Sequence, residues 1–182
     1  TTDIPWEVSG YTLSKDKSKI AFETNESGLN KMYLMDANSK KYSEIKGLPV
    51  GLVNNFEFTN DGKSLFFSQS TYDSSADIYR LDLATNKIER WTDSEQGEMQ
   101  KTDMSAPKLI EWKSFDGMKI TGFYYPVSKK FTGKRPVLIN IHGGPEGQSM
   151  ASSLGSGNYY TNEMGVALIY PNVRGSSGFG KT

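Results

Sequence analysis

Two glycine-rich segments carry residue types whose spacing could support chemistry. The last eight residues, GSSGFGKT (residues 175–182), match the phosphate-loop pattern G-x-x-x-x-G-K-[ST] at every fixed position. In a working phosphate loop the backbone amides surround the phosphates, a lysine in the place of Lys181 reaches the outer ones, and a hydroxyl in the place of Thr182 meets magnesium. A strand must run straight into the glycines and a helix must follow them. Here residues 171–174 separate the apolar run 166–170 from the glycines and the printed sequence stops at Thr182, so nucleotide binding is kept only as an alternative.

The second segment is HGGPEGQ (residues 142–148), which follows an apolar run that is typical of a buried strand. Glycines let the backbone approach a substrate closely, and a sharp glycine turn exposes backbone amides. In acyl-transfer enzymes of the α/β-hydrolase type, an H-G-G turn at this place supplies one of two amide donors to the tetrahedral oxyanion. Pro145 has no amide hydrogen and cannot donate. Gly144 is therefore the first candidate donor and Gly143 the second, while a tight turn without chemical duty is the alternative.

No complete catalytic set accompanies this turn. The nucleophile pattern G-x-S-x-G is absent, because Leu154 stands two residues before Ser156 and Phe179 stands two residues after Ser177. The single histidine, His142, lies inside the glycine turn, so we interpret it as shaping that loop rather than as a general base. One histidine and no cysteine cannot form the usual zinc site, and no calcium loop is present, so the sequence predicts neither a metal nor a cofactor.

Charge and hydropathy exclude several classes of partner. Lys plus Arg and Asp plus Glu both number 21, so the chain lacks the basic field that holds a nucleic-acid backbone. No apolar stretch of about 18 residues is present and the first ten residues do not resemble a signal peptide, which predicts no membrane partner. The absence of cysteine fits a reducing or an oxidising compartment equally well, so cytoplasm and periplasm both remain open.

The first hundred residues contain an internal repeat. LSKDKSKIAF (residues 13–22) aligns with FTNDGKSLFF (residues 58–67), an offset of 45 residues, and the match resumes with MYLMD (residues 32–36) over IYRLD (residues 78–82). Each unit reads as four short strands separated by turn-forming residues. A period near 45 residues with four strands is typical of propeller blades. Two blades cannot close a propeller, since they would leave apolar faces and strand edges in water.

From about residue 106 the pattern changes to that of an α/β domain. Two strand-like segments flank Phe115-Asp116-Gly117, which predicts an antiparallel hairpin. The runs at residues 136–141 and 166–170 are apolar nearly throughout, which predicts strands covered on both faces. The 24 residues between them leave room for a loop and a crossover helix that ends near Glu163-Met164, with Gly165 as its stop.

Taken with the blade repeats, four motifs resemble the prolyl oligopeptidase family of serine peptidases, and within it the acylaminoacyl-peptidase and dipeptidyl-peptidase-like members. The motifs are WKSFDG (residues 112–117), ITGFYYP (120–126), HGGP (142–145) and NVRGSSGFG (172–180). The resemblance implies a propeller followed by an α/β-hydrolase domain, both incomplete here. It also implies that the last motif has no nucleotide role and that the catalytic serine, aspartate and histidine lie beyond Thr182.

We therefore expect residues 1–105 to be the last two blades of a propeller and residues 106–182 to begin the hydrolase domain. The intact enzyme would hydrolyse short peptides through an acyl-enzyme, with Gly144 and Gly143 in the oxyanion turn. The rest of its own polypeptide would be the other partner of this chain, which alone should be inactive. An esterase of the same fold and a propeller-based binding module are the remaining alternatives. Arg174 is expected to brace neighbouring loops or to meet a substrate carboxylate.

Overall fold

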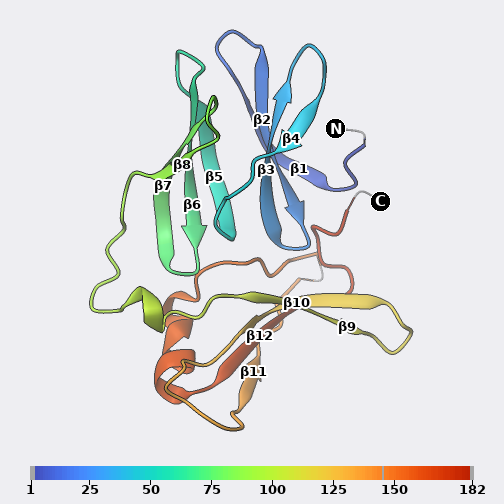
Figure 1. The fold of residues 1–182 in the computed structure, drawn as a ribbon. Coiled ribbons are helices and arrows are strands. Elements are labelled where there is room, and N and C mark those ends of the chain that lie inside the picture. The colour runs from blue at the N-terminus through green and yellow to red at the C-terminus, as the bar shows by residue number, and fades with distance from the viewer. Residues whose placement is uncertain (1–2, 145, 181–182) are drawn as a thin grey trace.

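The computed structural model describes residues 3–144 and 146–180, which form three four-stranded sheets with short helical segments. Figure 1 shows the first two sheets side by side, in blue to green, and the third beneath them, in yellow to red. Among the described residues, no helix is long and apolar enough to cross a membrane. The fold is that of propeller blades followed by the start of an α/β-hydrolase domain.

Each sequence repeat forms one antiparallel sheet whose strands follow chain order. The turns that the sequence predicts lie between these strands: Gly62 and Asn86 both adopt left-handed backbone conformations, with φ of 67° and 57°. The first blade contains β1 (Glu7–Leu13), β2 (Lys19–Glu26), β3 (Leu29–Asp36) and β4 (Tyr42–Glu44). The second contains β5 (Gly51–Phe58), β6 (Ser64–Thr71), β7 (Ser74–Asp82) and β8 (Ile88–Arg90).

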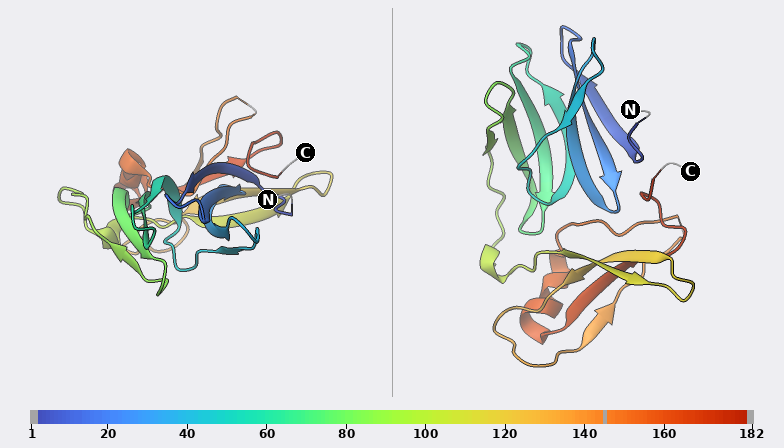
Figure 2. Two further views of the ribbon diagram at one scale, coloured as in Figure 1. Left: turned by 90° about the horizontal axis from the view of Figure 1, so that it is seen from above. Right: turned by 45° about the vertical axis from the view of Figure 1, so that its right-hand side comes forward.

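The facing sides of the two blades bury a shared core, because alternate residues along each strand point to the same face. Its aromatic and aliphatic side chains come from both repeats: Ala21, Met32, Val53, Phe58, Leu65, Phe67, Tyr79 and Leu81. The blades are therefore packed sheet against sheet, as Figure 2 shows from two further directions.

The third sheet begins after a linker that includes a 3-10 turn at Lys101–Asp103. Its strands are β9 (Lys108–Lys113), β10 (Lys119–Tyr125), β11 (Val137–Ile139) and β12 (Ala167–Asn172), in the order β11-β12-β10-β9. The predicted hairpin is confirmed by the antiparallel pairing of β9 and β10, with Gly117 at φ 86° in its turn. The predicted division between residues 105 and 106 lies in the linker, and as a domain boundary it stays a prediction.

A crossover joins the parallel strands β11 and β12, as the sequence predicts. Its helical part is short: a 3-10 turn at Gly155–Gly157 leads into a π-helix at Tyr160–Met164. Gly165 ends the helix in the left-handed conformation, with φ 62°, which confirms it as the stop.

Two expectations about the apolar runs are wrong. Residues 136–141 were expected to form a strand covered on both faces, but β11 is an edge strand of three residues, and Val137, Leu138 and Ile139 are 50%, 44% and 58% exposed. It pairs with β12 alone, and no other described strand covers it. Residues 171–174 were expected to lie outside a strand, yet β12 continues to Asn172. Pro171 is tolerated there because β11 pairs only with residues 167–169, so β12 has one partner strand at the proline.

Candidate functional site

The glycine turn follows the carboxyl end of β11 by two residues. Gly144 adopts a left-handed conformation with φ 53°, and the amide of Gly147 donates a hydrogen bond to the carbonyl oxygen of Gly144 over 2.8 Å. Among the described residues, no acceptor receives the amide hydrogen of Gly143 or Gly144. A Cβ added to either glycine would meet no described atom within 4 Å. The two candidate donors are thus exposed and have open space beside them.

His142 ties this turn to the segment after β12. Its Nε2 atom lies 2.9 Å from Oγ of Ser176, which in turn lies 2.6 Å from the carbonyl oxygen of Val173. Two oxygens at that distance need a hydrogen between them, and only the hydroxyl has one. Ser176 therefore donates to Val173, and Nε2–H of His142 donates to Ser176.

The hydrogen bonds of His142 differ from those of a general base. A base that activates a serine must accept the hydroxyl proton, whereas the Ser176 proton points to a carbonyl oxygen. On the other side of the ring, Nδ1 lies 3.3 Å from the carbonyl oxygen of Gly143, and no carboxylate in the described part of the chain is hydrogen-bonded to it. A Cβ on Gly147 would lie 2.9 Å from Nδ1, so the ring packs directly on the turn. The position of His142 agrees with a role in shaping the loop.

Asn172, at the end of β12, holds the other end of the loop. It is 2% exposed; its Oδ1 accepts the amide of Ser149 over 2.7 Å, and its Nδ2 donates to the carbonyl oxygen of Ser149 over 3.0 Å. This pair of bonds imitates the pairing of one more strand residue. In the sequence, Asn172 belongs to the motif at residues 172–180 but has no predicted role; the signal for one is that it is a polar residue at the end of an apolar strand.

Arg174 lies in the same segment and contacts the β9–β10 turn. Its guanidinium forms an ion pair with Asp116 and lies 5.3 Å from the centre of the Phe115 ring. The hydrogen bond from Arg174 is the main reason that the pKa of Asp116 is lowered from its ordinary value. These contacts correspond to the first of the two roles expected for Arg174, which is to brace neighbouring loops.

Comparisons with known proteins agree with this architecture. No protein-family model matches the chain. A curated protein of Bacillus subtilis (strain 168), "Uncharacterized peptidase YuxL", is 26% identical over 153 residues, which are 77% of this chain and 22% of that protein. Pyrococcus horikoshii acylaminoacyl peptidase is 25% identical with a TM-score of 0.74, covering 98% of this chain and 27% of its own.

Two further solved structures extend the comparison. A puromycin hydrolase superposes with a TM-score of 0.79 at 18% identity, covering 96% of this chain and 26% of its own. A structure from a study of two prolyl endopeptidases superposes with a TM-score of 0.77 at 18% identity, covering 98% and 26%. The resemblance to the prolyl oligopeptidase family is confirmed. The chain spans about a quarter of the length of these proteins.

Within a prolyl oligopeptidase-type fold, the glycines of the phosphate-loop pattern have a backbone explanation. Lys181 and Thr182 lie outside the described residues, so the part of the pattern that would meet magnesium is not placed. The two glycines that the pattern requires, Gly175 and Gly180, have φ of 84° and 109°, and a Cβ on Gly180 would lie 3.1 Å from the carbonyl oxygen of Pro5. The local backbone therefore favours glycine at both positions without a nucleotide.

Ser156 and Ser177 are the two serines that were compared with the nucleophile pattern in the sequence. Ser156 lies in the 3-10 turn of the crossover, and Ser177 donates its backbone amide to the carbonyl oxygen of Gly147 over 3.3 Å. His142 contacts neither of them through a side-chain hydrogen bond. The described part of the chain thus brings the two candidate oxyanion donors together with His142, Asn172 and Ser176.

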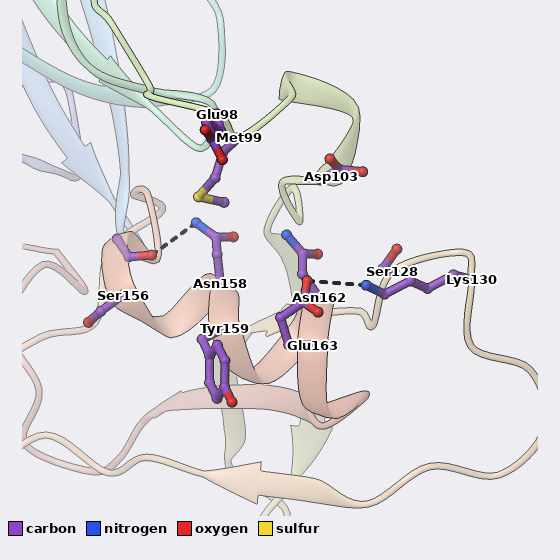
Figure 3. A pocket seen from close by; sticks show the side chains of 11 residues that line it. Glu98, Met99, Asp103, Ser128, Lys130, Ser156, Asn158, Tyr159, Asn162 and Glu163 are labelled. Carbon is purple, nitrogen blue, oxygen red and sulfur yellow. Dashed lines mark hydrogen bonds and ion pairs between the residues drawn. The ribbon is translucent and has the colours of Figure 1, made fainter.

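A cavity of about 470 Å³ lies away from the glycine turn, between the linker and the crossover helix (Figure 3). Lys130 and Glu163 form an ion pair of 3.1 Å at its edge. The Oδ1 atoms of Asn158 and Asn162 are buried beside it without a hydrogen-bond partner among the described residues. No described residue of the glycine turn lines this cavity, so it is not part of the candidate site.

Proposed function

We propose that this chain is part of a serine peptidase that releases short units from peptides through an acyl-enzyme. In this proposal the amide of Gly144 is one donor to the oxyanion and Gly143 is the second candidate. The observation that carries it is the pair of amides that have no partner among the described residues, in a braced turn at the end of a hydrolase strand. Relatives described as peptidases support the substrate class.

The turn would act when a serine attacks the scissile carbonyl. The carbonyl oxygen gains negative charge as the tetrahedral intermediate forms, and an amide that is already in place stabilises this charge without reorganisation. The base takes the serine proton during the attack and passes it to the amine, which leaves as the intermediate collapses to an acyl-enzyme; water then hydrolyses the acyl-enzyme. One such donor typically contributes about 2.7 to 4 kcal/mol to transition-state stabilisation. The serine, the base and its carboxylate would come from the rest of the intact protein.

An oxyanion turn does not by itself separate amide from ester substrates. Both reactions develop the same charge on the same oxygen, so the chemistry of the turn is shared. The choice of peptides rests on the propeller blades, which precede the hydrolase domain in the peptidases that the chain resembles, and on the names of its relatives. In the intact enzyme the propeller would limit substrates to short peptides.

The test treats the purified intact protein and the purified 182-residue chain with a fluorophosphonate probe, and takes the denatured mass of each polypeptide. Aminoacyl, acylaminoacyl and dipeptidyl arylamides are then assayed beside the matching esters. We expect labelling and arylamide hydrolysis by the intact protein and neither by the 182-residue chain. A label on the short chain would place the nucleophile within these residues. An intact protein that takes no label and cleaves nothing would favour a binding module, and one that cleaves only esters would favour an esterase.

A further inference from the structure

The end of β2 and the turn that joins it to β3 in the first blade lie directly against residues 148–151, which continue the chain after Gly147. Nδ2 of Asn25 donates to Oε1 of Gln148 over 2.6 Å, although 123 residues separate them in the chain. Two backbone hydrogen bonds flank this pair: Ser27 N–H to the carbonyl oxygen of Gly178 and Ala151 N–H to that of Gly28, each 3.0 Å. In Figures 1 and 2 this end of the first blade faces the third sheet.

Glycines allow this close approach. Gly28 has φ 87°, and an added Cβ would lie 2.7 Å from both the Phe123 ring and the carbonyl oxygen of Ser149. Leu29, the next residue, packs onto the core of the third sheet beside Phe123. The turn of the first blade therefore packs against core side chains of the third sheet.

Two successive connections link Asn25 to the candidate oxyanion donors. Gln148, which Asn25 holds, adjoins Gly147, and Gly147 closes the turn by donating to the carbonyl oxygen of Gly144. On the other side of Gln148, Ser149 is fixed to β12 by Asn172. The loop is thus anchored from the hydrolase sheet at Ser149 and from the propeller at Gln148.

We propose that Asn25 and Gln148 are positioning residues that fix the oxyanion turn only when the propeller is docked. This inference rests on the proposed function. Neither side chain would touch the substrate; both would act through Gly147 on the direction of the Gly144 amide. An oxyanion donor must lie about 2.7 to 3.1 Å from the developing charge, so a small shift of the loop affects the transition state more than the bound substrate.

The test measures kcat and KM of the intact enzyme for Gln148→Ala, Asn25→Ala and the double variant. We expect kcat to fall about 5- to 100-fold with KM nearly unchanged, because a displacement of about 1 Å at a catalytic group can lower the rate about 100-fold. The double variant should lose no more than the larger single loss, since both changes break one contact. Gln148→Ala is the cleaner variant, because Asn25 also accepts the amide of Gly28 through Oδ1.

Two controls separate positioning from simple stability. Asp73→Ala alters the corresponding β6–β7 turn of the second blade, and it should leave kcat and KM unchanged. Among the described residues, the side chain of Asp73 accepts a hydrogen bond from Thr71 alone. The exchange Asn25→Gln with Gln148→Asn preserves two facing amides and the combined side-chain length, so it should recover part of the kcat that the double alanine variant loses; the remaining loss would reflect the changed bond from Gly28 to Oδ1 of Asn25. All rates are compared well below the thermal midpoint of each variant, so that loss of folded protein does not enter kcat.

The outcomes distinguish the two proposals. If Gln148→Ala and Asn25→Ala keep the wild-type kcat while Gly144→Ala lowers it, the positioning role is wrong and the proposed function stands. A loss of kcat that the exchanged pair does not recover would also overturn the positioning role. If the intact wild-type protein hydrolyses no peptide or ester substrate, the proposed function itself fails.

Discussion

Gly144 combines two properties that a side chain would disturb. Its φ of 53° lies in the left-handed region, where an L-residue with a Cβ is strained by about 1 to 2 kcal/mol. Its amide is unpaired within the described part of the chain and available to a substrate oxygen. Replacing this glycine should therefore shift the donor as well as strain the backbone.

We predict that Gly144→Ala lowers kcat/KM of the intact enzyme by at least about 10-fold, since loss of a whole oxyanion donor costs about 100- to 1,000-fold. Gly133 provides a matched control: it has φ 75°, and an added Cβ there would also meet no described atom within 4 Å. Gly133→Ala should strain the backbone to a similar degree and leave kcat/KM unchanged. Steady-state kinetics with one arylamide decides the comparison. Equal kinetic losses in the two variants would show that strain, rather than the donor, is responsible.

Within the second blade, a buried carboxylate joins the strand β7 to the segment after β8. Asp77 is fully buried and accepts hydrogen bonds from Thr92 Oγ1 and from the amide of Ser94, each 2.8 Å. It also accepts bonds from Ser74 and Arg90. Burial by itself raises the pKa of Asp77, but these donors outweigh it and hold the pKa well below the ordinary value of 3.8. The ionised form is therefore the one that stabilises the blade.

A carboxyl with a lowered folded-state pKa contributes stability above the unfolded-state pKa, and that stability is lost as the pH falls from about 5 through 4 and below. We expect Asp77→Asn to lower the free energy of unfolding at pH 7 by about 3 kcal/mol, because Arg90 loses its buried partner. The variant should also lose less stability than the wild type between pH 5 and pH 3. Urea denaturation at several pH values measures both effects.

Asp93 is the control for this carboxylate. It pairs with the same Arg90 over 2.7 Å, but its side chain is 72% exposed and solvent screens the pair, so Asp93→Asn should leave the free energy of unfolding nearly unchanged. Similar losses in Asp77→Asn and Asp93→Asn would contradict the importance of the buried network.

At the scale of the whole molecule, the blades and the third sheet meet at a few closely packed points. Gly28 forms one of these points, since its carbonyl oxygen accepts the amide of Ala151 and a Cβ added to it would lie 2.7 Å from Phe123 and from Ser149. No rotation of a side chain can relieve a contact between a Cβ and the carbonyl oxygen of Ser149. The contact between propeller and hydrolase thus depends on a residue without a side chain.

We predict that Gly28→Ala loosens this contact. Overpacking should destabilise the protein by about 1 to 3 kcal/mol beyond the backbone strain, and proteolysis of the linker at residues 91–107 should become faster. Gly62→Ala, in the β5–β6 turn, has similar strain with φ 67° but no described neighbour within 4 Å of the added Cβ. Thermal unfolding and limited proteolysis of the two variants give the comparison. Identical behaviour would mean that the interface adjusts to the extra methyl group.

Local patterns in the sequence were sufficient to predict the blades, the β9–β10 hairpin, the helix stop at Gly165 and the position of the glycine turn. Each depends on residues that are near one another in the chain, where strand alternation and left-handed glycines act directly. Tertiary structure alone decided that Asn25 meets Gln148, that Ser176 accepts a hydrogen bond from His142 and that Asn172 holds Ser149. These pairs join segments that are distant in sequence, and a single sequence carries no signal for which polar side chains will face one another. The sequence could not predict the exposure of β11 either, because an apolar run indicates a strand suited to burial but does not indicate which segment covers it.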